Sequence, residues 1–272
     1  MGIGMRGILR DILTSIPKKN KSVSCIFLAY KLIIRGGRGV EKSKANMKAI
    51  LKKLVPFLGL TLMIAVFQVM SDGRLLTKGN LTSILNQTVY VGIMAFGAIF
   101  VYSHGGMDLS YGGVIGFSVL ISILMANTGI PIVVTFLVSV VSALVWFVLN
   151  GLVSVYLNVS PFITSLCIMY MCRGILNTVC ATQKYSIPVY MYEYDTWIVK
   201  IIALIMVYVI CYLLFEKGSI GKANKAIGGN PLAAAQAGIN VKATRMTAYL
   251  ISGITVGIAA FILMLRAGSA ST

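Results

Sequence analysis

Few side chains in the apolar part of this sequence have the chemistry of a functional site, and Asp108 is the most prominent. It lies in the stretch GGMDLSYGG, and between Gly79 and Cys172 only His104 and Asp108 are acidic or basic, cysteine and tyrosine aside. Glycines interrupt helices, and an aspartate followed by Leu-Ser can cap the next helix by accepting backbone N–H groups. Alternatively, the helix break places polar groups along the path of a solute.

Arg173 is the second such residue, because it lies about 12 residues, or roughly 18 Å, into an apolar run. In a membrane we expect an arginine there to face the bundle interior or a wet cavity, or to pair with a carboxylate or carbonyl groups. Four amides also have the groups that a polar solute needs, although helix–helix hydrogen bonds explain them equally well. They are Asn86, Gln87, Asn150 and Asn177.

The sequence lacks the motifs of several common catalytic and phosphate-binding sites. The chain has no GxxxxGK[ST] phosphate loop, no HExxH and no GxSxG, and it has a single histidine. Asp108 has no second intramembrane carboxylate beside it, which argues against a self-sufficient carrier driven by protons. We therefore predict no catalytic residue, no metal ligand and no cofactor, and a protein that is not an enzyme.

Composition places the elements that carry these residues in a bilayer. Hydrophobic residues make up 58% and charged residues 11%, with a mean hydropathy of +0.89; soluble domains have roughly 25% charged residues. The net charge of +17 does not indicate nucleic-acid binding, because 13 of the 24 Lys and Arg lie in the first 53 residues, as in a membrane flank. We predict an all-α, polytopic membrane helix bundle.

Seven apolar runs are long enough to cross a bilayer, at about 54–71, 81–103, 110–128, 130–157, 161–180, 197–216 and 246–265. The basic N-terminus predicts a cytoplasmic start. Seven spans then place the basic loop 217–245 in the cytoplasm as well and the C-terminus outside. We divide the chain into a basic leader, 1–48, with an interfacial amphipathic helix on membrane lipid, and a transmembrane domain, 49–272.

The loop 217–245 contains a short, uncharged helix with clear end signals. Asn230 suits the N-cap, Pro231 the first helical position and Gly238 the left-handed position after the last turn, so the pattern predicts a helix over PLAAAQA. So short a helix is marginal alone. We expect it to dock into a partner's groove; the alternative is that it folds back on its own bundle.

Four segments, in order along the chain from about residue 50, resemble the permease subunits of bacterial ribose/galactose/xylose-type ABC importers. They are GGMDLSYGG, NGLVSVYLNVSPFITSLCIMYMCRGI, AIGGNPLAAAQAGINV and YLISGITVGIAAFILMLRAGSA. The resemblance implies a simple-sugar importer of the bacterial inner membrane. Its implied partners are an ATP-hydrolysing subunit, a second permease subunit and an extracytoplasmic solute-binding protein.

The same resemblance implies that the region 226–240 couples the spans to the ATPase. The residues assigned to this coupling are Asn230, Pro231, Leu232, Ala233, Ala234, Ala235, Gln236, Ala237, Gly238, Ile239 and Asn240. This sequence departs from the family it resembles in two ways. Ser160 stands where many members have proline, and the family continues with further spans where this sequence stops at Thr272, so we expect the last spans to be lacking. The alternatives are a branched-chain amino-acid-type permease and a truncated, non-transporting membrane scaffold.

Overall fold

The structure is a computed structural model that describes residue 55 and residues 57–270. The amphipathic helix predicted within 1–48 lies outside these residues. The chain divides into two compact units, Met1–Thr77 and Lys78–Thr272. The described part of the first unit contains the apolar helix Phe57–Met70, most of whose large side chains are exposed. The domain boundary expected between residues 48 and 49 lies outside the described residues and stays a prediction.

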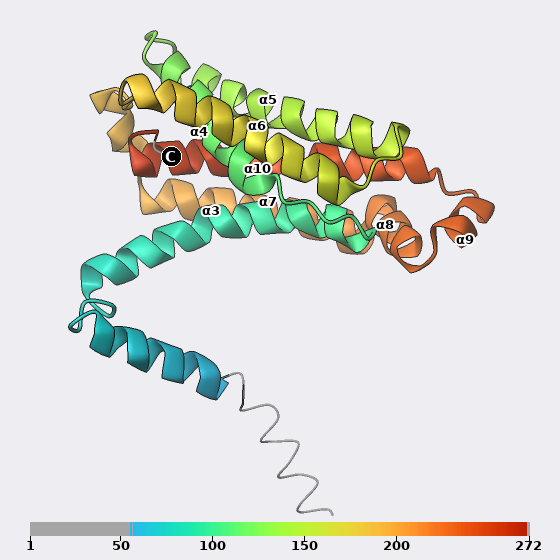
Figure 1. Cartoon of the computed structure of the whole chain (residues 1–272), viewed down its shortest axis with the longest axis horizontal. Coiled ribbons are helices and arrows are strands. Elements are labelled where there is room, and N and C mark those ends of the chain that lie inside the picture. Colours follow the sequence, from blue (N-terminus) through green and yellow to red (C-terminus); the bar gives the residue numbers. More distant parts are fainter. Residues whose placement is uncertain (1–54, 56, 271–272) are drawn as a thin grey trace, which may run out of the picture. The chain divides into compact units, whose positions relative to one another are not determined.

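The second unit is built from helices in the described residues (Figure 1). Their order is α3 (Lys78–Ser103), α4 (Tyr111–Ala126), α5 (Ile132–Gly151), η1 (Leu152–Tyr156), α6 (Pro161–Thr182), η2 (Val189–Tyr194), α7 (Trp197–Tyr212), η3 (Leu213–Lys217), α8 (Ser219–Gly229), α9 (Pro231–Gln236) and α10 (Val241–Ala267). The π-helical turns η1 and η3 prolong α5 and α7, whereas η2 is a 3-10 helix in the connection before α7. This arrangement confirms the all-α helix bundle.

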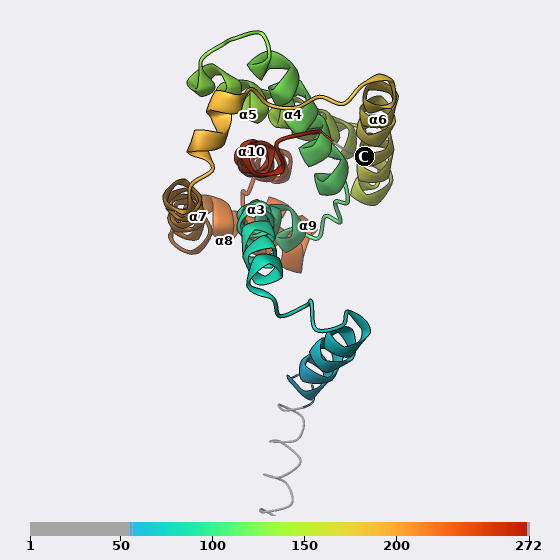
Figure 2. The ribbon, with the colours of Figure 1, turned by 90° about the vertical axis from the view of Figure 1, so that its left-hand side faces the viewer.

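Helix α10 forms the centre of this unit. Of its most apolar 18 residues, 72% are buried, against 17–33% in the other four long apolar helices. Figure 2 shows α10 with α4 and α5 on one side and α3 on the other, and its most extensive contacts are with these three helices. Glycine permits the close approach to α5, because a Cβ on Gly257 would lie 2.4 Å from the Cα of Val140. Ser139 Oγ donates to the carbonyl of Gly257 at 2.8 Å and joins the two backbones there.

Five described helices are long and apolar enough to cross a membrane, and two shorter apolar helices, Phe57–Met70 and α4, accompany them. Each of the seven predicted runs thus corresponds to a helix. Helix α4 has only 16 residues and is shorter than its predicted run. The helix begins after its N-cap Ser110 and ends before its C-cap Asn127. Before it, residues 104–110 leave the helical path, and Gly105 adopts a φ of +84°. Five spanning helices make the chain a multi-pass membrane protein.

The connections gather at two ends of the second unit. At one end, Lys242 at the start of α10 lies over the ring of Tyr156 in η1, with its Nζ 5.7 Å from the ring centroid. At the other end, Asn127 Nδ2 donates to the carbonyl of Ser186 at 2.9 Å, and the backbone N–H of Ile187 donates to the carbonyl of Gly268 at 2.9 Å. We refer to these as the α9 end and the C-terminal end. That the α9 end faces the cytoplasm stays a prediction.

Candidate functional site

Two of the predicted polar residues, Asp108 and Asn150, meet in the interior of the second unit. Asp108 is 1% exposed and Asn150 is fully buried. Asn150 Nδ2 donates to Asp108 Oδ2 at 2.9 Å, while the backbone N–H and the hydroxyl of Ser110 both donate to Asp108 Oδ1 at 2.7 Å. The carboxyl group therefore ties the loop before α4 to the end of α5. Burial raises the pKa of Asp108 above its ordinary value, and these hydrogen bonds oppose that shift.

The capping expected of Asp108 occurs in a modified form. Its side chain does accept a backbone N–H, but from Ser110, the N-cap residue itself, so Asp108 orders the turn before α4 instead of capping the first turn of the helix. The loop is fixed further by Ser165 Oγ of α6, which accepts the backbone N–H of Leu109 at 3.1 Å. Asp108 is thus a buried junction between α4, α5 and α6.

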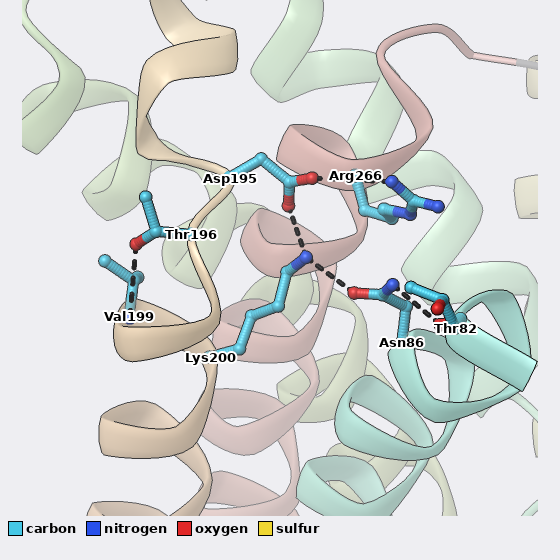
Figure 3. A network of polar contacts seen from close by, with 7 residues as sticks. All are labelled: Thr82, Asn86, Asp195, Thr196, Val199, Lys200 and Arg266. Atoms are coloured by element: carbon cyan, nitrogen blue, oxygen red, sulfur yellow. Dashed lines mark hydrogen bonds and ion pairs between the residues drawn. The ribbon is translucent and has the colours of Figure 1, made fainter. Parts of the chain in front are cut away.

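Asn86 belongs to a different network, at the C-terminal end (Figure 3). Lys200 Nζ of α7 donates to Asn86 Oδ1 at 2.6 Å and pairs with Asp195 Oδ1 at 2.6 Å. Arg266 Nη1 of α10 lies 3.7 Å from the other oxygen of Asp195. The side chain of Lys200 is only 5% exposed. The sequence reasoning did not single out Lys200 and Asp195, although Lys200 is the only charged residue in the apolar run before Glu216 and so carried a signal.

Arg173 does not face the interior of the described bundle and pairs with no carboxylate or carbonyl there, so among the expected surroundings the wet cavity stays a prediction. Its side chain is exposed on α6, and no hydrogen bond or ion pair to it occurs among the described residues. The nearest feature is α4, where a Cβ on Gly112 would lie 3.8 Å from Arg173 Nη2. Asn177, one helical turn further along α6, is exposed too, as is Gln87 on α3. An arginine facing lipid is costly, so this face of α6 requires a polar covering.

Helix α9 has the end signals that the sequence predicted. Asn230 Oδ1 accepts the backbone N–H groups of Leu232 and Ala233 at 3.0 and 3.1 Å, which confirms the N-cap. At the other end, the backbone N–H groups of Gly238 and Ile239 donate to the carbonyls of Ala235 and Ala234, and Gly238 has a φ of +84°. This is the Schellman arrangement of a helix end. The helix ends at Gln236, one residue before the predicted end.

The alternative that α9 folds back on its own bundle holds for one of its faces, whereas docking of the other face stays a prediction. Ala234 is 5% exposed and packs within this chain, where α9 contacts α8 and α10, so Ala234 is not available to a partner. Leu232 is 78% exposed on the opposite face. Asn240 also has a defined local role, because its Oδ1 accepts the backbone N–H of Ala243 at 3.0 Å and caps α10.

Comparison with known proteins agrees with this arrangement of helices. Residues 80–272 match the family described as "Branched-chain amino acid transport system / permease component". The ribose import permease protein RbsC of Bacillus subtilis (strain 168) is 29% identical over 238 residues, which cover 85% of this chain and 74% of that protein. The D-allose transport system permease protein AlsC of Escherichia coli (strain K12) is 25% identical over 239 residues, which cover 85% of this chain and 73% of that protein. No solved structure matches the chain.

A third relative, the galactose/methyl galactoside import permease protein MglC of Escherichia coli (strain K12), is 29% identical and covers 77% of this chain and 69% of its own length. The matched segment 80–272 includes every helix from α4 to α10 and most of α3. It therefore contains both polar networks, the exposed face of α6 and the capped helix α9. On the extent of this match, the chain belongs to the family of branched-chain amino acid transport system permease components.

Proposed function

We propose that this chain, a transmembrane permease subunit of an ABC importer, carries a simple sugar and is driven by a separate ATPase subunit that binds α9. The observation that carries the proposal is the construction of α9. It is capped at both ends, uncharged, anchored within its own chain through Ala234, and exposes Leu232 on the opposite face. An exposed leucine on an ordered, uncharged helix is typical of a docking surface.

The anchoring of α8 and α9 gives a physical route for coupling. Gly228 lies against the end of α3, where a Cβ would be 2.1 Å from the carbonyl oxygen of Ser103. Ser103 precedes the loop that holds Asp108, and Asn240 caps the central helix α10. A partner that displaced α9 would therefore act on α10 directly and on α3 through α8. We propose that this is how ATP hydrolysis on the partner reaches the spans.

The substitution Leu232→Glu tests the docking directly. We express the importer with its own ATPase and binding protein, tag this chain and measure the recovered ATPase subunit and solute uptake. Burying an unpaired carboxylate is costly, so we expect both to be lost at normal membrane levels of the chain. Ala181→Glu is the matched control, because Ala181 is exposed in the last turn of α6 at the C-terminal end. Normal ATPase recovery with Leu232→Glu would refute docking through α9.

The exposed face of α6 supports a second permease subunit around an aqueous path. Arg173 and Asn177 are polar, lie one turn apart and are not covered by the described part of the chain. Lipid is an unfavourable neighbour for such a face. We propose that a second permease, identical or related, covers it and that the two line the path of the solute between them. An extracytoplasmic binding protein would then deliver the solute at the C-terminal end.

The choice of solute class is supported by the names of the relatives, which include permeases for ribose, D-allose and galactose. The family description favours a second candidate, a branched-chain amino acid. Uptake of labelled ribose and galactose, compared with labelled leucine, by cells expressing the whole importer separates the two. Saturable sugar uptake that leucine does not inhibit is the expected result, and saturable leucine uptake alone would replace the proposal with the second candidate.

A further inference from the structure

A small cavity at the α9 end is separate from the surfaces discussed so far. Its volume is about 130 Å³, and it lies between the loop after α3, η1, the start of α6 and α10. The side chains of His104, Ser154, Arg245 and Tyr249 line it. One water molecule has a share of roughly 30 Å³ in the liquid. The cavity therefore has room for a few waters or for one small tetrahedral anion.

Three buried polar atoms of this lining have no hydrogen-bond partner among the described residues. They are Nε2 of His104, Nε of Arg245 and the hydroxyl oxygen of Tyr249. His104 is 4% exposed and Tyr249 is 1% exposed, so bulk water does not satisfy them. Buried polar groups are nearly always paired, and leaving one unpaired is unfavourable. Three such atoms around one cavity indicate a polar occupant.

The charge of the lining favours an anion. Arg245 is the only lining residue with a fixed charge, and none of the ion pairs found in the described part of the chain includes it. The cavity has no carboxylate in its lining. Arg245 is partly buried, and its Nε is one of the buried unpaired atoms; an anionic partner would satisfy this charge, and the planar N–H groups of a guanidinium suit an oxyanion.

We propose that this cavity binds a phosphate group, held by Arg245 and Tyr249 with His104 beside it. The guanidinium and the phenol O–H donate hydrogen bonds to phosphate oxygens. Nε2 of His104 forms a further hydrogen bond with the phosphate group. The group has two chemical sources, free inorganic phosphate and the headgroup of an anionic lipid. Basic pockets between membrane helices bind such headgroups.

The location gives this site a structural consequence. His104 follows Ser103, on which Gly228 of α8 packs, whereas Arg245 and Tyr249 belong to α10. A bound phosphate would join the loop after α3 to the first turns of α10, beside the helices that we assign to coupling. Its binding is measured without a transport assay, so this proposal and the proposed function can fail separately.

The test uses the complete purified importer. In delipidated detergent solution, we titrate inorganic phosphate against chloride at constant ionic strength and follow the thermal unfolding of this chain. In nanodiscs, we compare phosphatidylglycerol with phosphatidylcholine and identify retained lipid by native mass spectrometry. A saturable rise in Tm with phosphate identifies the free ion as a ligand, and selective retention of phosphatidylglycerol identifies the headgroup; either result supports the site.

The variants locate the effect. With Arg245→Gln we expect at least tenfold weaker phosphate binding or loss of the retained lipid, and with Tyr249→Phe a smaller weakening in a side chain of nearly unchanged shape. Lys242→Gln is the matched control, because it removes a positive charge one turn away and outside the lining, and it should bind as the wild type does. Should Arg245→Gln fail to assemble, Tyr249→Phe decides. An equal response in Tyr249→Phe, Lys242→Gln and wild type, or no response in either arm, would overturn the proposal and leave water as the occupant.

Discussion

At the scale of single residues, Asp108 is tolerated in the interior because its two oxygens have specific donors. Ser110 supplies the donors to Oδ1 and Asn150 supplies the donor to Oδ2. A buried carboxyl group without such donors would be strongly unfavourable. The fold therefore brings a donor to Asp108 from Asn150, 42 residues away. The sequence did not reveal this contact, because the two residues are far apart in the chain.

Asn150→Ala tests the importance of this contact for stability. The variant leaves Asp108 Oδ2 without its donor in a buried position, and we expect the free energy of unfolding to fall by about 1–3 kcal/mol. The measurement is the Tm of the purified chain in detergent. Asn177→Ala is the matched control, because Asn177 is exposed on α6 with no partner among the described residues. Equal Tm values for the two variants would show that the Asp108–Asn150 bond adds little.

His104 provides a prediction of pH dependence. Burial and the nearby charge of Arg245 lower its pKa from 6.5 to about 4, and a hydrogen bond to the backbone opposes this shift in part. Below pH 6.5 the unfolded chain then binds a proton that the folded chain does not, so stability falls as the pH drops from about 6.5 towards 4. We expect His104→Gln to show a weaker decline of Tm between pH 7.5 and 5 in phosphate-free buffer. An unchanged decline would assign it to other groups.

At the scale of elements, the packing of α8 on α3 depends on one glycine. A Cβ on Gly228 would meet the backbone of Ser103, which cannot move away as a flexible side chain would, whereas a Cβ on Gly229 would have nothing within 4 Å. Two adjacent glycines in the same helix thus differ completely in the space around them. The sequence shows two neighbouring glycines but not the difference in the space around them.

Gly228→Ala and Gly229→Ala therefore form a matched pair of variants. We expect Gly228→Ala to displace α8 from the end of α3 and to lower both Tm and the solute uptake of the assembled importer, because a 2.1 Å contact with backbone has to be relieved. Gly229→Ala should leave both near the wild-type values. Normal uptake with Gly228→Ala would argue against a coupling route from α8 to α3.

At this scale, the sequence predicts the features whose residues lie close together in the chain and misses those that depend on how distant helices pack. The caps of α9 lie within the residues Asn230 to Ile239, so local chemistry was enough to predict the N-cap and the left-handed Gly238. The sequence left the surroundings of Arg173 open between the bundle interior, a wet cavity and a polar partner. Helical spacing does not show which face of α6 the rest of the chain covers. The Lys200–Asn86 contact spans 114 residues and depends on how α3 and α7 pack.

At the scale of the whole molecule, the second unit presents an incomplete exterior. Its exposed apolar side chains suit lipid, but the face of α6 with Arg173 and Asn177 does not, and α9 exposes an apolar side chain at an end that we expect to be in water. Each of these surfaces suits a different neighbour. The expectations of partner subunits and of a chain that lacks the family's last spans remain predictions.

Cys167 allows the environment of the α6 face to be measured. It is exposed on α6, two turns before Gly174, about 80° from Asn177 and about 120° from Arg173 around the helix axis, whereas Cys172 and Cys211 are buried. If this face lines an aqueous path, a water-soluble maleimide should label Cys167 in the assembled importer, and added solute should slow the labelling. The Cys167→Ser variant identifies the labelled site. Labelling only by lipid-soluble reagents would place the face against lipid.

The central position of α10 has a further consequence, for the order of folding. Helix α10 follows in the sequence every helix that it packs against, and it supplies the buried interior between α3, α4 and α5. During synthesis these earlier helices reach the membrane before the element that separates them exists. Gly97 of α3, whose Cβ would collide with Thr255 of α10, and Val140 of α5, which Gly257 of α10 approaches, would then face lipid or another helix. We therefore predict that the native arrangement forms only when α10 enters late, between helices that are already inserted.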